Sequence, residues 1–502
     1  MSPLSVCVNL SYNFHNANRK RIGVERKTNV ILILSDDQGY WAMGCAGNRE
    51  LHTPNIDTLA KTGMMFENFF CASPVCSPAR ATILTGRIPS AHGIHDWLAA
   101  GNTTSRYEPP STKLIQYLDN IPGYTDYLVE NGYYCGISGK WHLGDSHHVQ
   151  KSFNFWRVHA KGGGNYYGAT MIKNNRAYVE KRYVTEVITD NAIEFLESAI
   201  KKQKPFYLSV HYTAPHSPWT RQQHPEKTFD RYYNECPFKS VPYEISKRPE
   251  WVKKLSIPVH DEKTRRTYLS GYFAAIEEMD KNIGRILGWL DEHHLRDSTL
   301  VIFTSDNGMN MGHHGVFGKG NATFPLNMFE ESIRVPCIFS HPQVIPQGKI
   351  NSMLVSQYDL MPTILDYPGL KISGPQHLCG RSFADVLRGK EADQREFVVI
   401  FDEYGPVRMV RTGRWKYVKR YPYGPDELYD LKTDPHEEKN LINATGFEKI
   451  KRQLRIQLRE WFLKYTDSQM DGVYESVTGK GQIGPCGTKS RGNVAFNVIS
   501  FE

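Results

Sequence analysis

Apolar runs and helix-periodic segments alternate along the first two thirds of the chain. Three short runs, within residues 28–39, 204–218 and 298–308, are almost wholly apolar before they end in polar residues, as is typical of strands buried on both faces of a parallel sheet. Residues 184–202 and 265–294 instead repeat apolar positions at helical spacing. This alternation predicts a doubly wound α/β domain.

The pattern changes near residue 375. Residues 407–431 alternate with period two and contain turn residues, as antiparallel strands do, and residues 447–467 read as a closing amphipathic helix. We therefore expect an N-terminal extension (1–27), a large α/β domain (28–375), a smaller C-terminal α+β subdomain (376–466) and an irregular tail (467–502).

Composition narrows the class of protein. The 502 residues are 40% apolar and 23% charged, as in an ordinary soluble globular protein. The net charge of +8 suits an anionic substrate, although a solvated surface is the simpler explanation. No nucleic-acid module is recognisable, and no apolar stretch approaches the 18 or so residues of a membrane span.

Cysteine usage and the N-terminus bear on the compartment. The nine cysteines are odd in number and form no CxxC pair, which argues against a disulfide framework and against a structural zinc site. The first 27 residues contain no apolar core of signal-peptide length. We expect a cytoplasmic protein, export by another route, or a true start further downstream.

Four predicted strands end in polar residues that a structural role does not require. These residues are Asp36 and Asp37, Lys140 and His142, His216, and Asp306 and Asn307. Each has an ordinary explanation, since Asp and Asn form turns and a single His is commonly structural. Ligands of parallel α/β sheets bind outside the carboxyl ends of the strands, so together these side chains predict one shared crevice.

The chemistry of these residues divides into two kinds. Asp36, Asp37, Asp306 and Asn307 offer hard oxygen ligands, which favour calcium or magnesium over zinc. Lys140, His142, His216 and, from "GVFGKGNATFP", Lys319 are cationic or carry protons. A divalent cation surrounded by such groups can clamp a compact oxyanion and stabilise charge on a leaving oxygen.

The stretch "SPVCSPARATILTGR", residues 73–87, places a cysteine at the start of a predicted helix. We expect Ser77 to be the N-cap and Pro78 to lie in the first turn. The helix start then offers N–H groups to an anion, with Arg80 one turn further on. The alternative is that Cys76 is only a buried cysteine before a helix.

Together these motifs resemble the type I sulfatase family. "CSPAR" at 76–80 fits the family's Cys-x-Pro-x-Arg signature, and "TGR", "GKWHLG", "APHSPW", "SDNG" and "GKG" follow in the family's order. The resemblance covers residues 28 to about 465. It implies an alkaline phosphatase-like fold, in which helices sandwich a large mixed, mostly parallel sheet, with a smaller C-terminal subdomain.

The resemblance also implies a mechanism. In this family the cysteine is oxidised during synthesis to formylglycine, by a formylglycine-generating or an anaerobic sulfatase-maturating enzyme. The aldehyde hydrate at residue 76 would attack sulfur, form a sulfated hemiacetal and expel sulfate by collapsing to the aldehyde. Calcium, more readily than magnesium, would be held by Asp36, Asp37, Asp306, Asn307 and residue 76.

The family's pattern assigns the remaining roles. Arg80 would steady the modified side chain, and Lys140 and Lys319 would contact sulfate oxygens. His142 would take the proton of the free hydroxyl, and His216, with Lys319, would protonate the leaving oxygen. Substrate binding would fall to Lys140, His216 and Lys319, with His314 as a further candidate whose choice over His313 the sequence leaves open.

Three functions fit these residues. The first is a sulfatase acting on a sulfated small molecule or glycan, with a carbohydrate sulfate favoured over a steroid or aryl sulfate. The second is a phosphodiester or phosphonate monoester hydrolase of the same superfamily, and the third a non-catalytic binder of sulfated glycans. Residues 158–176 and 220–255 mix aromatic and basic residues and are candidates for substrate recognition or plain surface loops.

Overall fold

The computed structural model describes residues 27–497, except 105, 107–112, 244, 371–377, 392, 394, 422 and 423. Apart from Lys27, the expected N-terminal extension lies outside the described residues. The part of the chain described contains no disulfide, and its eight cysteines are free thiols. None of the described helices combines the length and the apolar character needed to cross a bilayer.

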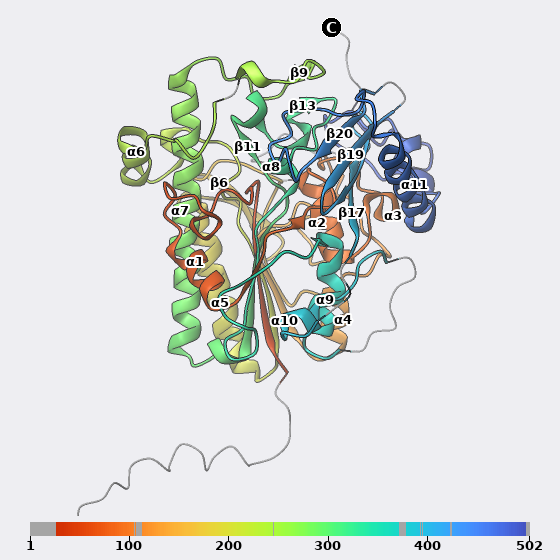
Figure 1. The fold of residues 1–502 in the computed structure, drawn as a ribbon. Helices are drawn as coiled ribbons and strands as arrows, with labels where there is room; N and C mark the ends of the chain where they lie inside the picture. The colour runs from red at the N-terminus through yellow and green to blue at the C-terminus, as the bar shows by residue number, and fades with distance from the viewer. Residues whose placement is uncertain are drawn as a thin grey trace, which may run out of the picture.

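A ten-stranded sheet runs through the centre of the molecule (Figure 1). Its order is β15-β2-β14-β10-β1-β8-β4-β5-β6-β7, and the run from β10 to β5 is parallel, whereas β14, β6 and β7 pair antiparallel with their neighbours. The strands are β1 (Asn29–Ser35), β2 (Met64–Phe66), β4 (Tyr134–Lys140), β5 (Phe155–His159), β6 (Ala169–Lys173), β7 (Arg176–Glu180), β8 (Phe206–His211), β10 (Thr299–Ser305), β14 (Cys337–Ser340) and β15 (Lys349–Asn351).

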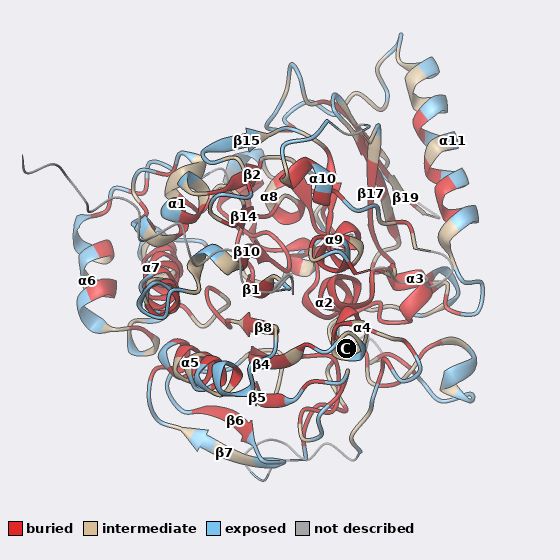
Figure 2. Cartoon of the chain, turned by 90° about the horizontal axis from the view of Figure 1, so that it is seen from below, coloured by how far each residue is buried: buried red, intermediate tan, exposed pale blue. Residues whose placement is uncertain are grey.

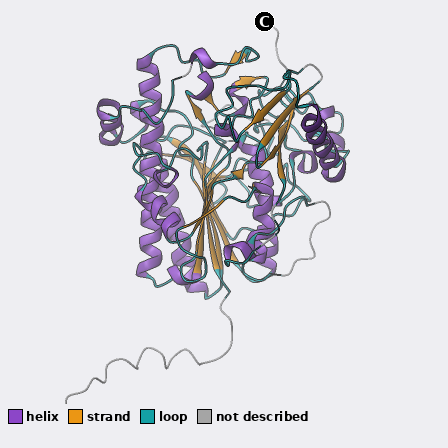
Figure 3. Cartoon of the chain, in the orientation of Figure 1, coloured by secondary structure: helices purple, strands orange, loops and turns teal. Residues whose placement is uncertain are grey.

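Helices cover both faces of this sheet (Figure 3). In Figure 1, α1, α5 and α7 lie on one face and α2, α4, α9 and α10 on the other. The helices are α1 (Pro54–Lys61), α2 (Cys76–Thr85), α3 (Pro89–His92), α4 (Tyr124–Glu130), α5 (Val184–Lys202), α6 (Glu226–Glu235), α7 (Glu262–Glu292), α8 (Glu330–Ile333), α9 (Leu360–Asp366), α10 (Ala384–Leu387) and α11 (Glu448–Tyr465).

The position of strand β1 between two layers of helices explains why its sequence is apolar throughout. Ile31 and Ile33 belong to the core cluster that includes residues of α5 and α7, whereas Leu32 and Leu34 belong to the cluster that includes α2, α4 and α9. Successive side chains of a strand point to opposite faces, so a strand covered on both sides needs apolar residues at every position. The predicted α/β class, with a mostly parallel sheet between helices, is confirmed.

A separate antiparallel sheet lies on the C-terminal side, in the order β17 (Phe397–Asp402), β18 (Val407–Thr412), β19 (Trp415–Arg420) and β20 (Glu427–Asp430). Helix α11 packs on it through Leu454, Leu458, Trp461 and Phe462. The smaller C-terminal subdomain is thus confirmed. The remaining strands form two-residue pairs: β3 (Phe69–Phe70), β9 (Lys254–Leu255), β11 (Asn310–Met311), β12 (Phe317–Gly318), β13 (Thr323–Phe324) and β16 (Val355–Ser356).

The segment after α11 returns to the large domain. Gln482 is fully buried, its backbone bonds to Trp97 and Ala99, and its side chain accepts from the His95 amide and donates to the Gly93 carbonyl. This segment therefore fixes the loop of residues 93–102. Figure 2 shows that the central strands and the helices beside them are largely buried, whereas α11 at the periphery is largely exposed.

Candidate active site

The polar residues singled out in the sequence follow four neighbouring strands. Strands β10, β1, β8 and β4 are adjacent and parallel in the sheet, so their carboxyl ends lie at one edge. Asp306 and Asn307 follow β10, Asp36 and Asp37 follow β1, and the others follow or end β8 and β4. The geometry brings the residues of these four loops together with α2.

Three carboxylates form the centre of the site. Single oxygens of Asp36, Asp37 and Asp306 lie within 4.8 Å of one another, and all three side chains are buried. Asn307 donates to Asp37 Oδ1 at 2.8 Å, which leaves its own Oδ1 buried without a hydrogen-bond partner. One oxygen of Asp36 is likewise buried without a hydrogen bond.

Three cations surround the carboxylates. Lys140 Nζ lies 2.6 Å from Asp36 Oδ2, Arg80 Nε lies 2.8 Å from Asp306 Oδ2, and Lys319 Nζ lies 2.6 Å from Asp37 Oδ1. Lys319 also lies 2.7 Å from Cys76 Sγ. An unpaired buried charge is strongly unfavourable. Because each carboxylate here is paired with a cation, the cluster can be buried.

The carboxylates titrate unequally. Burial, only partly offset by Lys140, raises the pKa of Asp36 to about 8. For Asp306 the effect of burial is outweighed by Arg80 and Lys140, which hold its pKa well below the usual range. Three neighbouring carboxylates repel one another, and this repulsion together with burial leaves one of them hard to ionise. A bound divalent cation relieves the repulsion.

The residues present fit a hard divalent cation. One side-chain oxygen of Asp36 and one of Asn307 are buried without a hydrogen bond, and the neighbouring oxygen donors are carboxylates. Calcium and magnesium prefer such oxygen ligands, whereas zinc in proteins prefers nitrogen and sulfur. This part of the chain is a candidate metal site.

Helix α2 begins at the cysteine itself. Val75 is the N-cap, and Cys76 is the first helical residue. The expectation that Ser77 caps the helix is wrong, because Ser77 lies within the first turn, where its Oγ accepts a hydrogen bond from the Leu98 amide at 3.1 Å. Burial raises the pKa of the Cys76 thiol, so the unmodified side chain is a weak nucleophile at neutral pH.

His142 is held in a single orientation. It has a positive φ of 52°, and its Nε2 lies 3.2 Å from the Leu98 carbonyl, so Nε2 carries the proton and Nδ1 is the basic nitrogen. Nδ1 is buried without a hydrogen-bond partner. A Cβ at Gly162 would lie 2.0 Å from the His142 ring, so only glycine permits this close approach.

His216 is oriented in a similar way. Its Nδ1 donates to the Ser217 carbonyl at 2.7 Å, and its Nε2 lies 3.7 Å from Asp37 Oδ2. Burial lowers the pKa of His216 to about 4, although Asp37 acts in the opposite direction. Nε2 is therefore the nitrogen that can exchange a proton within the site.

The two adjacent histidines considered in the sequence, His313 and His314, contact different neighbours. His314 Nε2 pairs with Glu331 Oε2 at 3.0 Å, and its ring stacks on Phe329 with centroids 3.9 Å apart. The His313 ring packs on Trp41 at 5.0 Å. A substrate-binding role for His314 stays a prediction.

Several supporting residues were not anticipated. Gln357 donates to the carbonyls of Ser305 and Asp306 and accepts from the Ala72 amide, which ties the end of β10 to the segment before Cys76. The Leu98 backbone contacts both Ser77 and His142. Neither residue carries a sequence signal, whereas the glycines of "KGGGNYYG" are a signal from which the close approach at Gly162 could have been predicted.

Comparison with known proteins decides the family. A family model described as "Sulfatase" matches residues 28–370, and one described as "N-sulphoglucosamine sulphohydrolase, C-terminal" matches residues 312–464. The chain belongs to the sulfatase family. It is a sulfuric ester hydrolase with the alkaline phosphatase-like fold that the motifs implied.

Individual relatives cover most of this sulfatase. An N-acetylglucosamine-6-O-sulfatase of Bacteroides thetaiotaomicron is 28% identical and aligns over 91% of this chain and 90% of its own length. An N-acetylgalactosamine-6-sulfatase of Canis lupus familiaris is 28% identical over 78% of this chain and 72% of its own. A solved structure in complex with its substrate D-glucosamine-2-N,6-O-disulfate superposes with a TM-score of 0.75 at 25% identity, covering 89% of this chain and 100% of that one.

Proposed function

We propose that this sulfatase cleaves a sulfate monoester on a carbohydrate, through a formylglycine made from Cys76 and a calcium ion. The observation that carries the proposal is the position of Cys76 at the first turn of α2, 2.7 Å from Lys319, which itself pairs with Asp37. A modified side chain here adjoins the oxygen donors that fit a metal. The relatives named above act on sulfated amino sugars, which supports a carbohydrate substrate.

Asp36, Asp37, Asp306, Asn307 and the modified residue 76 would hold the calcium. When bound, the ion supplies positive charge that lowers the pKa of a coordinated hydroxyl and polarises a sulfate oxygen. The hydrated aldehyde supplies an oxygen nucleophile where the thiol of Cys76, with its raised pKa, would be a poor one.

The cations of the site position the sulfate group. Lys140 and Lys319 each donate one hydrogen bond to a carboxylate, and an ammonium group has three N–H donors. Their remaining donors can contact sulfate oxygens and stabilise the charge that develops during transfer. Arg80 bonds to Asp306 and to the Lys140 carbonyl, so it orients the metal ligand and the loop that carries Lys140.

The two histidines move protons at defined atoms. His142 accepts a proton at Nδ1 from the hydroxyl of residue 76, because its Nε2 proton is committed to the Leu98 carbonyl. His216 donates from Nε2 to the leaving oxygen. The pKa of about 4 makes its charged form a stronger acid than an ordinary imidazolium, and the negative charge of a bound sulfate ester favours that charged form.

A substrate panel tests this function. The enzyme, co-expressed with a maturating enzyme, is incubated with glucosamine 6-sulfate, N-acetylgalactosamine 6-sulfate, a steroid sulfate, 4-nitrophenyl sulfate and bis(4-nitrophenyl) phosphate. We expect a sugar sulfate to give the highest kcat/KM. Faster turnover of the phosphate diester would favour the phosphodiesterase alternative, and no turnover of any compound by fully modified protein would favour the non-catalytic binder.

A further inference from the structure

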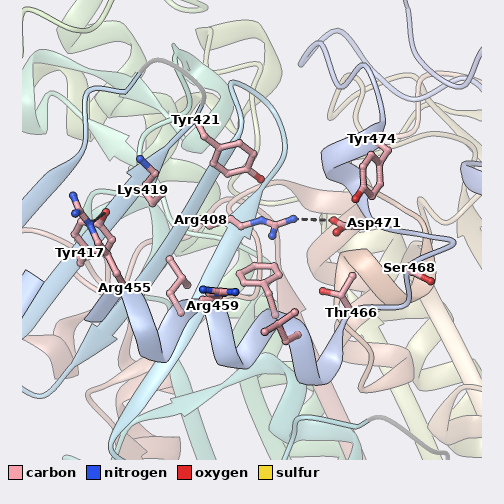
Figure 4. Close-up of a pocket in the computed structure, with 13 residues that line it drawn as sticks. Arg408, Tyr417, Lys419, Tyr421, Arg455, Arg459, Thr466, Ser468, Asp471 and Tyr474 are labelled. Atoms are coloured by element: carbon pink, nitrogen blue, oxygen red, sulfur yellow. Dashed lines mark hydrogen bonds and ion pairs between the residues drawn. The ribbon is translucent and has the colours of Figure 1, made fainter. Parts of the chain in front are cut away.

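We call the carboxylate cluster with Cys76 and its surrounding cations the strand-end site. A separate cavity lies between α11, strands β18 and β19 and residues 466–474. Its volume is about 590 Å³. Figure 4 shows Tyr421 near the Arg408 end and Tyr474 near the Asp471 end of the Arg408–Asp471 ion pair, with Arg455 and Arg459 along α11. Helix α11 lies at the edge of the molecule (Figures 1 and 2), away from the carboxyl ends of the central strands.

The wall formed by α11 is strongly basic. Between Glu448 and Tyr465 the helix contains six Lys and Arg residues and two Glu residues. Arg459 is exposed and has no ion pair with any residue that the structure describes, and the side chain of Arg455 is 56% exposed despite its contact with Asp426 at 3.6 Å. Positive charge is therefore available to a ligand on this side.

The floor of the cavity is built differently. Arg408 is largely buried and pairs with Glu403 at 2.7 Å and Asp471 at 2.8 Å. Its guanidinium lies over the Phe462 ring, 3.8 Å from the centroid. The charge of Arg408 is thus compensated within the protein, so the positive charge that this cavity offers to an anion comes from α11 and not from the floor.

Tyrosines complete the cavity. Tyr421 is anchored through its hydroxyl to Glu403 at 2.5 Å, whereas Tyr474 is 82% exposed at the opposite side. Exposed apolar patches rimmed by polar residues mark binding sites, and the 74% exposed Leu463 lines this cavity together with Tyr474. Rings of this kind present apolar faces that suit the C–H face of a sugar, and the neighbouring arginines suit its sulfate groups.

We propose that this cavity is a non-catalytic binding site for a sulfated oligosaccharide. Charge complementarity selects this occupant, because the exposed Arg455 and Arg459 line the same cavity as Tyr421 and Tyr474. Binding here would hold a polymeric substrate on the enzyme while its sulfate groups are removed at the strand-end site. The inference concerns binding and does not depend on the proposed chemistry at Cys76.

The test compares two double variants of the full-length enzyme. Arg455→Gln with Arg459→Gln removes two charges inside the cavity, and Lys449→Gln with Arg452→Gln removes two exposed charges from the same helix outside it. Binding of dextran sulfate and of uncharged dextran is measured by calorimetry at about 0.15 M salt. Turnover of 4-nitrophenyl sulfate by the same preparations reports separately on the catalytic site.

We expect the cavity pair to weaken dextran sulfate binding about tenfold and the control pair about twofold or less. Tyr474→Ala should weaken binding severalfold, dextran should not bind, and turnover of the small ester should not change. Equal losses in both pairs would show general attraction to a basic helix and overturn the proposal, as would no loss in either. A wild-type dimer that the cavity pair dissociates, with unchanged dextran sulfate binding, would make this surface a subunit interface instead.

Discussion

The strand-end site and the α11 cavity use the same kinds of side chain in opposite ways. Lys140 and Arg80 are almost fully buried and pair with carboxylates at 2.6 and 2.8 Å, whereas Arg455 and Arg459 are exposed and at most weakly paired. Buried pairs fix geometry, and removing one member leaves an uncompensated charge. Exposed charges attract ligands over a distance and are screened by salt. Changes in the first region should abolish turnover, and changes in the second should alter affinity.

The largest effect is expected at Asp306. Asp306→Asn keeps the shape of the side chain but removes the charge of a proposed metal ligand and the charged partner of Arg80, so kcat/KM should fall by about 10³-fold or more. The matched control is Asp430→Asn in the second sheet, where Asp430 pairs with Arg414 at 2.7 Å. It should change kcat/KM by about twofold or less.

Calcium binding measured by calorimetry completes this comparison. Asp306→Asn should bind the ion weakly and the control should bind it normally. If the wild-type enzyme keeps full turnover in excess chelator, the assignment of a metal to these carboxylates is wrong.

The next effect separates proton donation from positioning. If His216 protonates the leaving oxygen, His216→Ala should lower kcat/KM about 10²- to 10³-fold for a sugar sulfate, whose alkoxide leaves poorly. The loss for 4-nitrophenyl sulfate should be about tenfold, because its phenolate leaves without a proton. Equal losses on both esters would assign His216 to binding alone.

A smaller effect is expected from crowding the site without removing a polar group. A methyl group at Gly162 would displace the His142 ring, which lies 2.0 Å from the position of that Cβ. Gly162→Ala should therefore lower kcat about 10- to 100-fold. Gly288→Ala is the control, since a Cβ there meets nothing within 4 Å, and an equal effect of both changes would contradict the role of Gly162.

The smallest effect concerns the loop that touches both regions. His95 Nε2 donates to the Met470 carbonyl at 2.9 Å, and Leu98 of the same loop contacts His142. Burial lowers the pKa of His95 from 6.5 to about 4. Its contribution to stability is thus complete above about pH 6.5 and is lost as the pH falls towards 4, by about 2 kcal/mol at pH 5.

Urea unfolding at pH 8 and pH 5 measures this contribution. His95→Gln should lose about 2 kcal/mol less than the wild type between the two pH values, whereas His260→Gln, at an exposed position, should follow the wild type. Parallel pH profiles for the wild type and His95→Gln would contradict the prediction.

Sequence periodicity predicted those parts of the fold whose pattern comes from burial. Helix α5 spans the predicted residues 184–202, and β1 and β10 fall within the predicted apolar runs. The antiparallel extension of the sheet through β6 and β7 was not predicted. Residues of β7 are partly exposed, so they have little of the apolar signal that marks a central strand.

The same limit applies to the site. Residues that follow the central strands could be predicted to meet, because parallel strands end at one edge. The prediction of Ser77 as an N-cap failed because its Oγ accepts a hydrogen bond from the amide of a residue 21 positions away. A hydrogen bond over that distance in sequence leaves no local pattern. Gln482 fixes the loop of residues 93–102 from almost 400 positions away and was equally invisible in the sequence.

The central claim is that turnover depends on a modified Cys76, and mass spectrometry of the peptide carrying residue 76 tests it most directly. Preparations made with and without a maturating enzyme are compared for that mass, for reaction with hydrazides and for sulfate release. We predict a peptide lighter than encoded, as expected when a formyl group replaces the thiomethyl group, and activity that rises in proportion to the modified fraction. Full activity from protein in which Cys76 is an unmodified thiol would contradict the account.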